Sequence, residues 1–464
     1  MRGRLVGWAA AVVGVTFASA EGVLLNVRIR DFDEGVYWQS IRALARGEAL
    51  FSSVFASQPP GFYGLLLPLY SVSRSLVSLR LTVLILGLAG LGATYVAGRL
   101  LAGPVAALIA TVLVASSPLY FHQSAIIQAD APSVALSGVA VCLALLAVRR
   151  QRGTAIALAA LSGVVLAAAV GTKFLSVVTA VPVAIVLLDR TGPRWRLVGA
   201  AAAGGLAGVA AVFLPAFEAP GPAFNQLVTE HLRASQVAHQ GFSESLSILF
   251  LRREQPLQAL GLMAATIGGI RRDRAIAMPL AWSVVSIAAA LLYHPVFPHH
   301  LVMLSIPLAL LVAVGLRPSP QMAEGVPRLA IAGLVLATAG AGAVAIAGEM
   351  QLSFVPDLHD QEMTAAVQSM SPLGDFWISD NPWAIASADR DLPGPLVDTA
   401  SQRIRTRLLT VNDLERARLA YHVRWVLEDS FRLDHVPGYQ DWLDAHFRVA
   451  RRLGGDAVVY EANP

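Results

Sequence analysis

Long apolar runs separated by short polar segments dominate the pattern of this 464-residue chain. A helix needs about 20 mostly apolar residues to cross the hydrocarbon core of a membrane, and most of the runs approach or reach that length. The eleven runs cover about residues 5–26, 80–98, 104–119, 130–148, 154–171, 174–189, 196–216, 256–270, 275–293, 301–316 and 329–348. The pattern predicts an all-α polytopic membrane protein with about 11 transmembrane helices.

Arginines gather in the loops at alternate ends of these runs. The loops that follow the second, fourth, sixth, eighth and tenth runs carry Arg99, Arg149, Arg150, Arg152, Arg190, Arg194, Arg196, Arg271, Arg272, Arg274, Arg317 and Arg328. Cytoplasmic loops are rich in arginine and lysine, so this pattern predicts a cytoplasmic N-terminus in a multi-pass cell-membrane protein. An odd number of spans then places residues 349–464 on the outer face, with the loops 28–79, 119–129, 217–255 and 294–300.

The chain divides into two predicted domains. Residues 1–348 form the transmembrane domain, in which the short apolar stretch 60–70 of the outer loop is interpreted as an interfacial or re-entrant helix. Residues 349–464 alternate strand-like and helical patterns and predict a small α/β domain on the outer face. The strand-like runs are 376–378, 422–427 and 457–460, and the helical patterns are 412–420 and 438–448. This domain is interpreted either as a lid or recognition module or as a purely structural cap.

Composition narrows the possible classes of protein. Hydrophobic residues make up 55% of the chain and charged residues only 14%, which excludes a soluble cytosolic enzyme. The single cysteine, Cys142, excludes an internal disulfide and a cysteine metal cluster. The slight excess of basic residues lies in short loops and reports membrane orientation, so no nucleic-acid partner is expected.

Charged residues crowd the start of the first outer loop. Asp31, Asp33 and Glu34 lie beside Arg28 and Arg30, directly after the first span. Such carboxylates either face water or, held near the interface, act as a general base or as metal ligands. The following residues 35–46 have the pattern of an amphipathic helix lying along the interface.

The order of these features resembles GT-C glycosyltransferases, in particular the protein O-mannosyltransferase and aminoarabinose transferase branch (glycosyltransferase families 39 and 83). The resemblance covers about residues 1–315 in layout. It rests on Asp33-Glu34 and Tyr37 after the first span, Gly47 at the end of the amphipathic helix, Gln58-Pro59-Pro60 before the short apolar helix, Asp130 after the third span and Lys173 at the end of the fifth. Gln58 departs from the family pattern, in which a lysine precedes the two prolines.

The resemblance implies an inverting transferase that moves a sugar from a polyprenyl-phosphate donor to an acceptor hydroxyl on the outer face of the membrane. Asp33 is then the general base, and Glu34 orients Asp33 or binds the sugar. The phosphate leaving group needs fixed positive charge. The candidates are Lys173 first, then Arg80, His299, His300 and Arg233. Asp130, Asp31 and Tyr37 are further candidates for binding the substrate or a metal.

Structural roles stay open for several of these residues. Lys173 also fits a cation that reaches up to the lipid headgroups, and Asp130 also fits a charge that complements a helix N-terminus. The histidines near 294–300, and Glu230-His231 in the long outer loop, form possible ligands for a divalent metal, although no cofactor is required by the pattern. An ordered outer turn explains the first group equally well.

Two other classes of function remain as alternatives: a transporter or flippase for a lipid or glycan, and a non-catalytic protein of envelope assembly. A transporter needs charges or broken helices at the membrane midplane, and the sequence has almost none. The sugar, the length of the polyprenyl chain and the acceptor (lipid, glycan or protein) are not determined by the sequence. The arginine and alanine content indicates a bacterial source.

Overall fold

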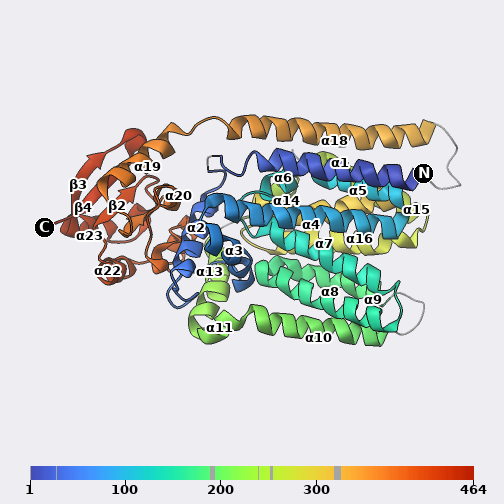
Figure 1. Cartoon of the computed structure of the whole chain (residues 1–464), viewed down its shortest axis with the longest axis horizontal. Helices are drawn as coiled ribbons and strands as arrows, with labels where there is room; N and C mark the ends of the chain where they lie inside the picture. Colours follow the sequence, from blue (N-terminus) through green and yellow to red (C-terminus); the bar gives the residue numbers. More distant parts are fainter. Residues whose placement is uncertain (1, 28, 189–193, 239, 251–253, 318–325) are drawn as a thin grey trace.

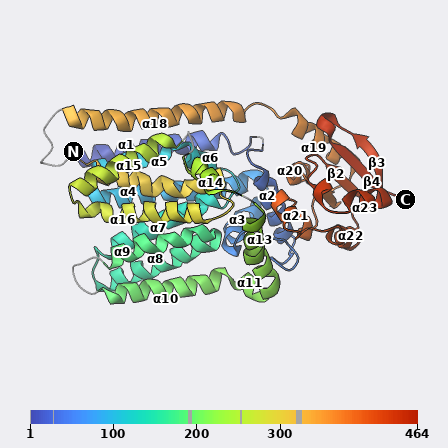
Figure 2. The same cartoon turned by 180° about the vertical axis from the view of Figure 1, so that it is seen from behind.

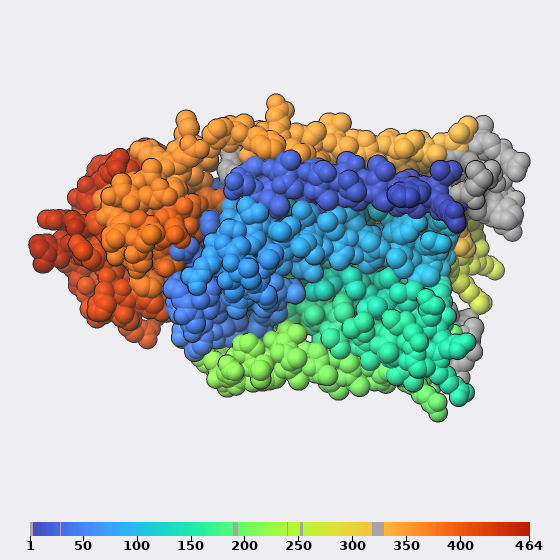
Figure 3. All heavy atoms as spheres, in the orientation of Figure 1, coloured from blue at the N-terminus to red at the C-terminus, as the bar shows by residue number. Residues whose placement is uncertain are grey.

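The computed structural model describes residues 2–27, 29–188, 194–238, 240–250, 254–317 and 326–464. A bundle of long helices carries a smaller mixed domain at one end, and the N-terminus lies at the other end (Figures 1 and 2). The space-filling view shows this domain packed directly onto the end of the bundle (Figure 3).

Each of the eleven predicted apolar runs contains a helix. They are α1 (Arg2–Gly22), α4 (Leu76–Ala102), α5 (Pro104–Ala115), α7 (Asp130–Ala147), α8 (Arg152–Thr172), α9 (Ala180–Leu187), α10 (Trp195–Val212), α15 (Gln255–Ile270), α16 (Ala277–Leu292), α17 (Ser305–Gly315) and α18 (Val326–Ser353). Among the described residues, eight helical stretches are long and apolar enough to cross a membrane. The predicted class, a polytopic helical membrane protein, is confirmed.

Close packing of two helices in this bundle depends on glycine. A Cβ atom at Gly163 of α8 would lie 1.9 Å from the carbonyl oxygen of Ala201 in α10. Membrane helices approach closely where small residues line the interface, because lipid supplies no hydrophobic force that drives them together. The small residues of α8 and α10 therefore fix one wall of the bundle.

Short helices fill the end of the bundle beside the C-terminal domain. They are α2 (Phe32–Ala45), α3 (Pro60–Ser73), α6 (Pro118–Gln123), η1 (Phe174–Thr179), α11 (Leu214–Glu218), α12 (Pro220–Phe224), η2 (Asn225–Thr229), α13 (Glu230–Val237), α14 (Phe242–Leu249) and η4 (Pro298–Leu304); a further turn, η3, covers Arg274–Ile276. The predicted amphipathic helix and the short apolar helix correspond to α2 and α3. Both are too short to span a bilayer upright, at 14 residues each.

The C-terminal domain contains a four-stranded sheet in the order β1-β2-β4-β3. Strand β1 runs parallel to β2, and the other neighbours are antiparallel. The strands are β1 (Trp377–Ser379), β2 (Trp425–Glu428), β3 (Phe447–Arg452) and β4 (Val458–Ala462). The helices are α19 (Leu358–Met370), α20 (Pro382–Ser387), η5 (Gly394–Leu396), α21 (Ser401–Arg405), α22 (Val411–Ala420), η6 (Leu433–His435), α23 (Tyr439–His446) and η7 (Gly454–Asp456).

The sequence predicts three of these strands and misses β3. Five of its six residues, Phe447 to Arg452, are exposed and three are arginines, and the sequence lacks the alternation of a half-buried strand. The predicted helix over 438–448 is consequently too long, because α23 ends at His446. The last span also continues to Ser353, five residues beyond the predicted end of the transmembrane domain.

Candidate functional site

Helix α2 carries two adjacent carboxylates into different surroundings. Asp31 caps the helix, since its Oδ1 accepts a hydrogen bond from the Asp33 amide at 2.9 Å. The helix lies tightly against the C-terminal domain, where a Cβ atom on Gly35 would be 2.5 Å from the backbone nitrogen of Trp383. This contact fixes α2, and with it the direction of the Asp33 and Glu34 side chains.

Glu34 points into the protein and binds Arg80. Both side chains are fully buried, and Arg80 Nε and Nη2 donate to the two Glu34 oxygens at 2.9 and 2.7 Å. The amides of Ile127 and Arg30 also donate to this carboxylate. Burial alone raises the pKa of Glu34, but the Arg80 charge and these hydrogen bonds outweigh it and hold the pKa below its ordinary value.

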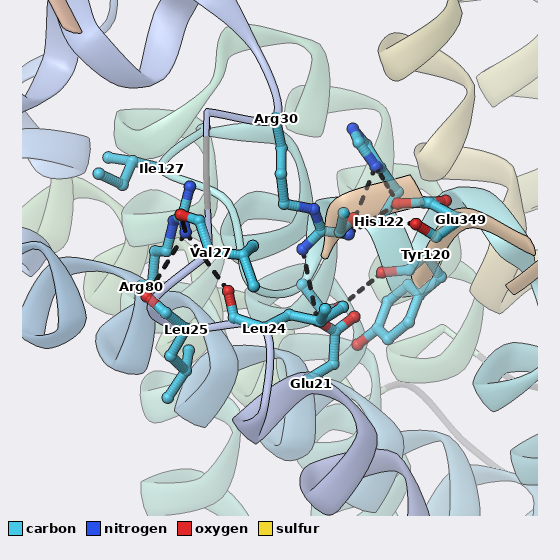
Figure 4. A network of polar contacts seen from close by, with 12 residues as sticks. Glu21, Leu24, Leu25, Val27, Arg30, Arg80, Tyr120, His122, Ile127 and Glu349 are labelled. Carbon is cyan, nitrogen blue, oxygen red and sulfur yellow. Dashed lines mark hydrogen bonds and ion pairs between the residues drawn. The ribbon is translucent and has the colours of Figure 1, made fainter. Parts of the chain in front are cut away.

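Arg80 joins this carboxylate to the end of the first span. Its Nη1 donates to the carbonyl oxygens of Leu24 and Val27, which lie in the turns directly after α1 (Figure 4). Beside it, Arg30 lies between Glu21, His122 and Glu349, at 2.7 Å from the last of these (Figure 4). The two arginines connect α1, α6 and α18 to the segment that leads from α1 into α2.

Asp33 instead lines a cavity of about 450 Å³ at the junction of the bundle and the C-terminal domain. Of the residues singled out in the sequence, Asp31, Tyr37, Asp130, Lys173, His299 and His300 line the same cavity. Glu34, Arg80 and Arg233 are not among its lining residues, and Arg233 is exposed on α13. A direct contact of Arg80 with a ligand in this cavity is therefore not supported.

Lys173 and Asp130 form a buried pair in the cavity wall. The Lys173 Nζ atom lies 2.7 and 2.6 Å from the two Asp130 oxygens, and the two residues are 8% and 4% exposed. Lys173 ends α8 in extended backbone, and Asp130 is the first residue of α7. This pairing opposes a purely lipid-facing role for Lys173, since its ammonium group points into the protein.

Burial, together with the negative charges of Asp31 and Asp398, raises the pKa of Asp33 to about 8, although the Lys173 charge acts to lower it. A carboxylate with a pKa near neutrality retains a useful affinity for a proton while being substantially ionised in mildly alkaline solution. Asp33 therefore has the properties of a general base, and Glu34 does not. The Tyr37 hydroxyl accepts a hydrogen bond from Gln58 Nε2 at 3.1 Å, and both residues line the cavity together with Asp33.

One group of side chains has the composition of a divalent metal site. Asp130, His299 and His300 each offer one ligand atom, and these atoms lie within 4.8 Å of one another. Two imidazoles and a carboxylate suit zinc, so Asp130, His299 and His300 would be the residues that hold such an ion. Lys173 already contacts both oxygens of Asp130, so a metal ion would compete with Lys173 for this carboxylate.

Three cavity residues come from the C-terminal domain and were not predicted: Asp398, Ala400 and Gln402. Asp398 and Ala400 precede α21 and Gln402 lies within it, in a segment with no catalytic pattern more than 350 residues after Asp33. Glu230 and His231 also line the cavity, from α13. The sequence suggested these two as metal ligands, but they are not part of the three-residue group above.

Comparisons with known proteins agree with this architecture. Residues 57–217 match a family model described as dolichyl-phosphate-mannose-protein mannosyltransferase. No curated protein sequence matches significantly. The crystal structure of ArnT from Cupriavidus metallidurans bound to undecaprenyl phosphate is similar over 99% of both chains, at 14% identity and a TM-score of 0.73.

A second similar structure is the archaeal oligosaccharyltransferase AglB from Archaeoglobus fulgidus, in complex with an inhibitory peptide and a dolichol-phosphate. The similarity covers 98% of this chain and 74% of AglB, at 13% identity and a TM-score of 0.57. The predicted resemblance to GT-C proteins of the protein mannosyltransferase and aminoarabinose transferase type is therefore confirmed, by the family model over residues 57–217 and by the fold over nearly the whole chain.

Proposed function

We propose that this protein is an inverting glycosyltransferase that moves a sugar from a polyprenyl-phosphate donor to an acceptor hydroxyl. The observation that carries the proposal is one cavity shared by Asp33, whose pKa is raised to about 8, and the buried pair Lys173–Asp130. A proton acceptor and a fixed cation are the two groups that this reaction requires.

The reaction follows from the positions of these groups. Asp33 takes the proton of the acceptor hydroxyl, whose oxygen attacks the anomeric carbon on the face opposite the phosphate. The bond between that carbon and the phosphate oxygen breaks, and the configuration inverts. Lys173 stabilises the negative charge that develops on the departing lipid phosphate.

The donor class is supported by what similar proteins bind. The structurally similar ArnT is bound to undecaprenyl phosphate, and AglB to a dolichol-phosphate. The matching family model is described by a dolichyl-phosphate-mannose donor. We therefore propose the same class of donor, a lipid-linked sugar phosphate, for this chain. Its lipid tail would lie in the membrane and its headgroup in the cavity.

Other residues receive supporting roles. His299 and His300 lie beside Lys173 and are proposed to contact the donor phosphate, either directly or through a divalent metal shared with Asp130. Such an ion would supply additional positive charge at the leaving phosphate. Glu34 and Arg80 hold α2 in place and are proposed as positioning residues, since neither lines the cavity.

The arginine-rich loops support the proposed orientation. Arg271 donates to the Arg317 carbonyl, and Arg317 binds Asp273 at 2.8 Å, so two of these loops meet at one end of the bundle. With those loops in the cytoplasm, the N-terminus is cytoplasmic, and the cavity and the C-terminal domain lie on the outer face.

The test is release and transfer of radiolabelled sugar from a panel of polyprenyl-phosphate sugars by purified protein in detergent. Wild type is compared with Asp33→Asn, and with Asp441→Asn as a charge-matched control at an exposed position of α23. Label release by wild type and by the control, with loss in Asp33→Asn, supports the proposal. Equal release by Asp33→Asn, or no release by folded wild-type protein with any donor, contradicts it.

A further inference from the structure

The C-terminal domain closes one side of the cavity with residues 393–405, a segment that contains η5 and α21. In this segment the Gly394 carbonyl accepts a hydrogen bond from the Phe55 amide at 3.0 Å. A Cβ atom on Gly394 would lie 2.5 Å from the Ser53 carbonyl oxygen, so the two segments are in direct contact. Asp398 Oδ1 accepts from the Ala400 amide at 2.9 Å, which fixes the turn that presents Asp398 and Ala400 to the cavity.

A buried arginine supports this segment from behind. The Arg403 guanidinium carbon lies 3.6 Å from the centre of the Phe55 ring, and Arg403 Nη1 donates to the Asp398 carbonyl oxygen at 2.7 Å. Arg403 is 4% exposed and is not among the residues that line the cavity. Its charge therefore balances nearby carboxylates without being available to a ligand.

Glu230 faces the same part of the molecule from α13. It is 5% exposed and lines the cavity, and its Oε2 atom has no hydrogen-bond partner among the described residues. Both Glu230 and Asp398 act electrostatically on Arg403, which places the three groups in one neighbourhood. A buried oxygen without a partner costs free energy, so this carboxyl group is arranged to meet a ligand that donates a hydrogen bond.

The charged residues in the cavity wall around Glu230 and Asp398 indicate the chemical class of that ligand. Among the described residues that line the cavity, Lys173 is the only lysine or arginine, and it pairs with Asp130. Glu230, Asp398 and Gln402 therefore present side-chain oxygen atoms to a ligand. In the described chain, no lysine or arginine lines the cavity opposite them that could pair with a negatively charged ligand. A phosphate or carboxylate placed there would be repelled and left unpaired, whereas hydroxyl groups would satisfy these oxygens.

We infer that Glu230, Asp398 and Gln402 form the acceptor subsite, and that the acceptor is an uncharged polyhydroxylated group, such as a sugar residue, rather than a phosphorylated one. This inference rests on the proposed function, because the cavity receives an acceptor only if the protein is a glycosyltransferase. A hydroxyl of the acceptor is held by the C-terminal domain and α13 while Asp33, in the same cavity, removes its proton. Because Arg403 balances one of the two carboxylates, the subsite has no strong preference for a cationic acceptor.

The test measures the charge that the subsite admits and needs no turnover. Cys142 is buried, so Ala400→Cys places a single accessible thiol beside Asp398. The thiol is labelled with hydroxyethyl, sulfonatoethyl and trimethylammonioethyl methanethiosulfonate, which are neutral, anionic and cationic. Ala420→Cys, on the exposed end of α22, gives the intrinsic reactivity ratio of the three reagents.

Loss of hydration on entering the buried cavity should slow both charged reagents about threefold, and the Asp398 carboxylate should slow the anion and speed the cation by a similar factor. Relative to the Ala420→Cys reference, we therefore expect the anionic reagent to react about tenfold more slowly than the neutral one, and the cationic reagent to stay within about threefold of it. Adding Asp398→Asn, which keeps a side-chain oxygen for the turn, is expected to reduce the discrimination against the anion to about threefold. Adding Asp441→Asn is expected to leave it unchanged.

An anionic reagent that reacts as fast as the neutral one overturns the inference. A cationic reagent that reacts more than about tenfold faster than the neutral one overturns it in favour of an amine acceptor. Because labelling is independent of catalysis, failure of the proposed function appears separately, as absence of Asp33-dependent label release.

Discussion

Asp33 and Glu34 are neighbours on one helix and differ in almost every property that matters for chemistry. Asp33 faces a cavity, and burial with nearby carboxylates raises its pKa to about 8. Glu34 faces the protein interior, where Arg80 outweighs the effect of burial and lowers its pKa. Successive residues of a helix point about 100° apart, so adjacent positions place one carboxylate in the cavity wall and the other in a buried ion pair.

The difference shows that burial does not decide the charge state by itself. Both carboxylates lose water, but within the described part of the chain only Glu34 receives a buried cation and several hydrogen-bond donors in exchange. Asp33 has carboxylates as its main electrostatic neighbours, and its free energy of ionisation stays high. The Asp33 carboxyl group therefore exchanges its proton near neutral pH, whereas Glu34 stays ionised in its pair with Arg80.

Substitution of Asp33 is expected to have the largest effect on activity. Asp33→Asn removes the proton acceptor and should lower the turnover number about 10²–10⁴-fold, the usual range for a general base. The melting temperature should be unchanged or higher, because a poorly paired buried carboxylate is lost. Label release and thermal unfolding of the same preparation check both parts, and a fall in activity that parallels a fall in melting temperature would contradict them.

Substitution of Glu34 should act on stability instead. Glu34→Gln leaves the buried Arg80 charge without its partner, which typically costs about 3–5 kcal/mol. We expect a lower melting temperature and less folded protein in detergent. In the double variant Glu34→Gln, Arg80→Met no uncompensated charge remains, so much of the stability should return. A single variant as stable as wild type would show that the pair does not hold α2.

Substitution of Lys173 tests the cation side of the cavity. Lys173→Met removes charge from the leaving phosphate and should lower turnover about 10–100-fold, a few kcal/mol in activation free energy. Because Lys173 lowers the pKa of Asp33, the acid limb of the pH–rate profile should also move to higher pH. Lys173→Arg, which keeps the charge but changes its geometry, is the matched control. A profile that keeps its position in Lys173→Met would argue against electrostatic contact between Lys173 and Asp33.

The sequence predicted the bundle and part of the site for a physical reason. Membrane helices are specified by local hydropathy, and Asp33, Asp130 and Lys173 were predicted because they stand beside predicted spans in the order of the GT-C pattern. The pairing of Glu34 with Arg80 was missed, and Arg80 was assigned to the phosphate, because a cation's partner depends on which side of its helix faces inward. Asp398 and Gln402 were missed because tertiary packing alone brings the C-terminal segment to the cavity, and no local pattern records it.

The finest test of the comparison changes a neighbour of Asp33 without touching Asp33. Asp31→Asn keeps a side chain that caps helices as well as aspartate does, so α2 and its stability should be preserved. It removes a negative charge that raises the pKa of Asp33, so that pKa should fall. Asp33 acts as a base only when ionised, and the acid limb of label release, expected near pH 8 in wild type, should therefore move to lower pH by up to about one unit. The rate plateau at high pH should change little. The measurement is the pH profile of label release for both proteins, with melting temperatures at each pH. An acid limb that stays in place would mean that Asp31 does not act on the group that titrates. An acid limb that moves to higher pH would show that Asp31 lowers, rather than raises, the pKa of that group.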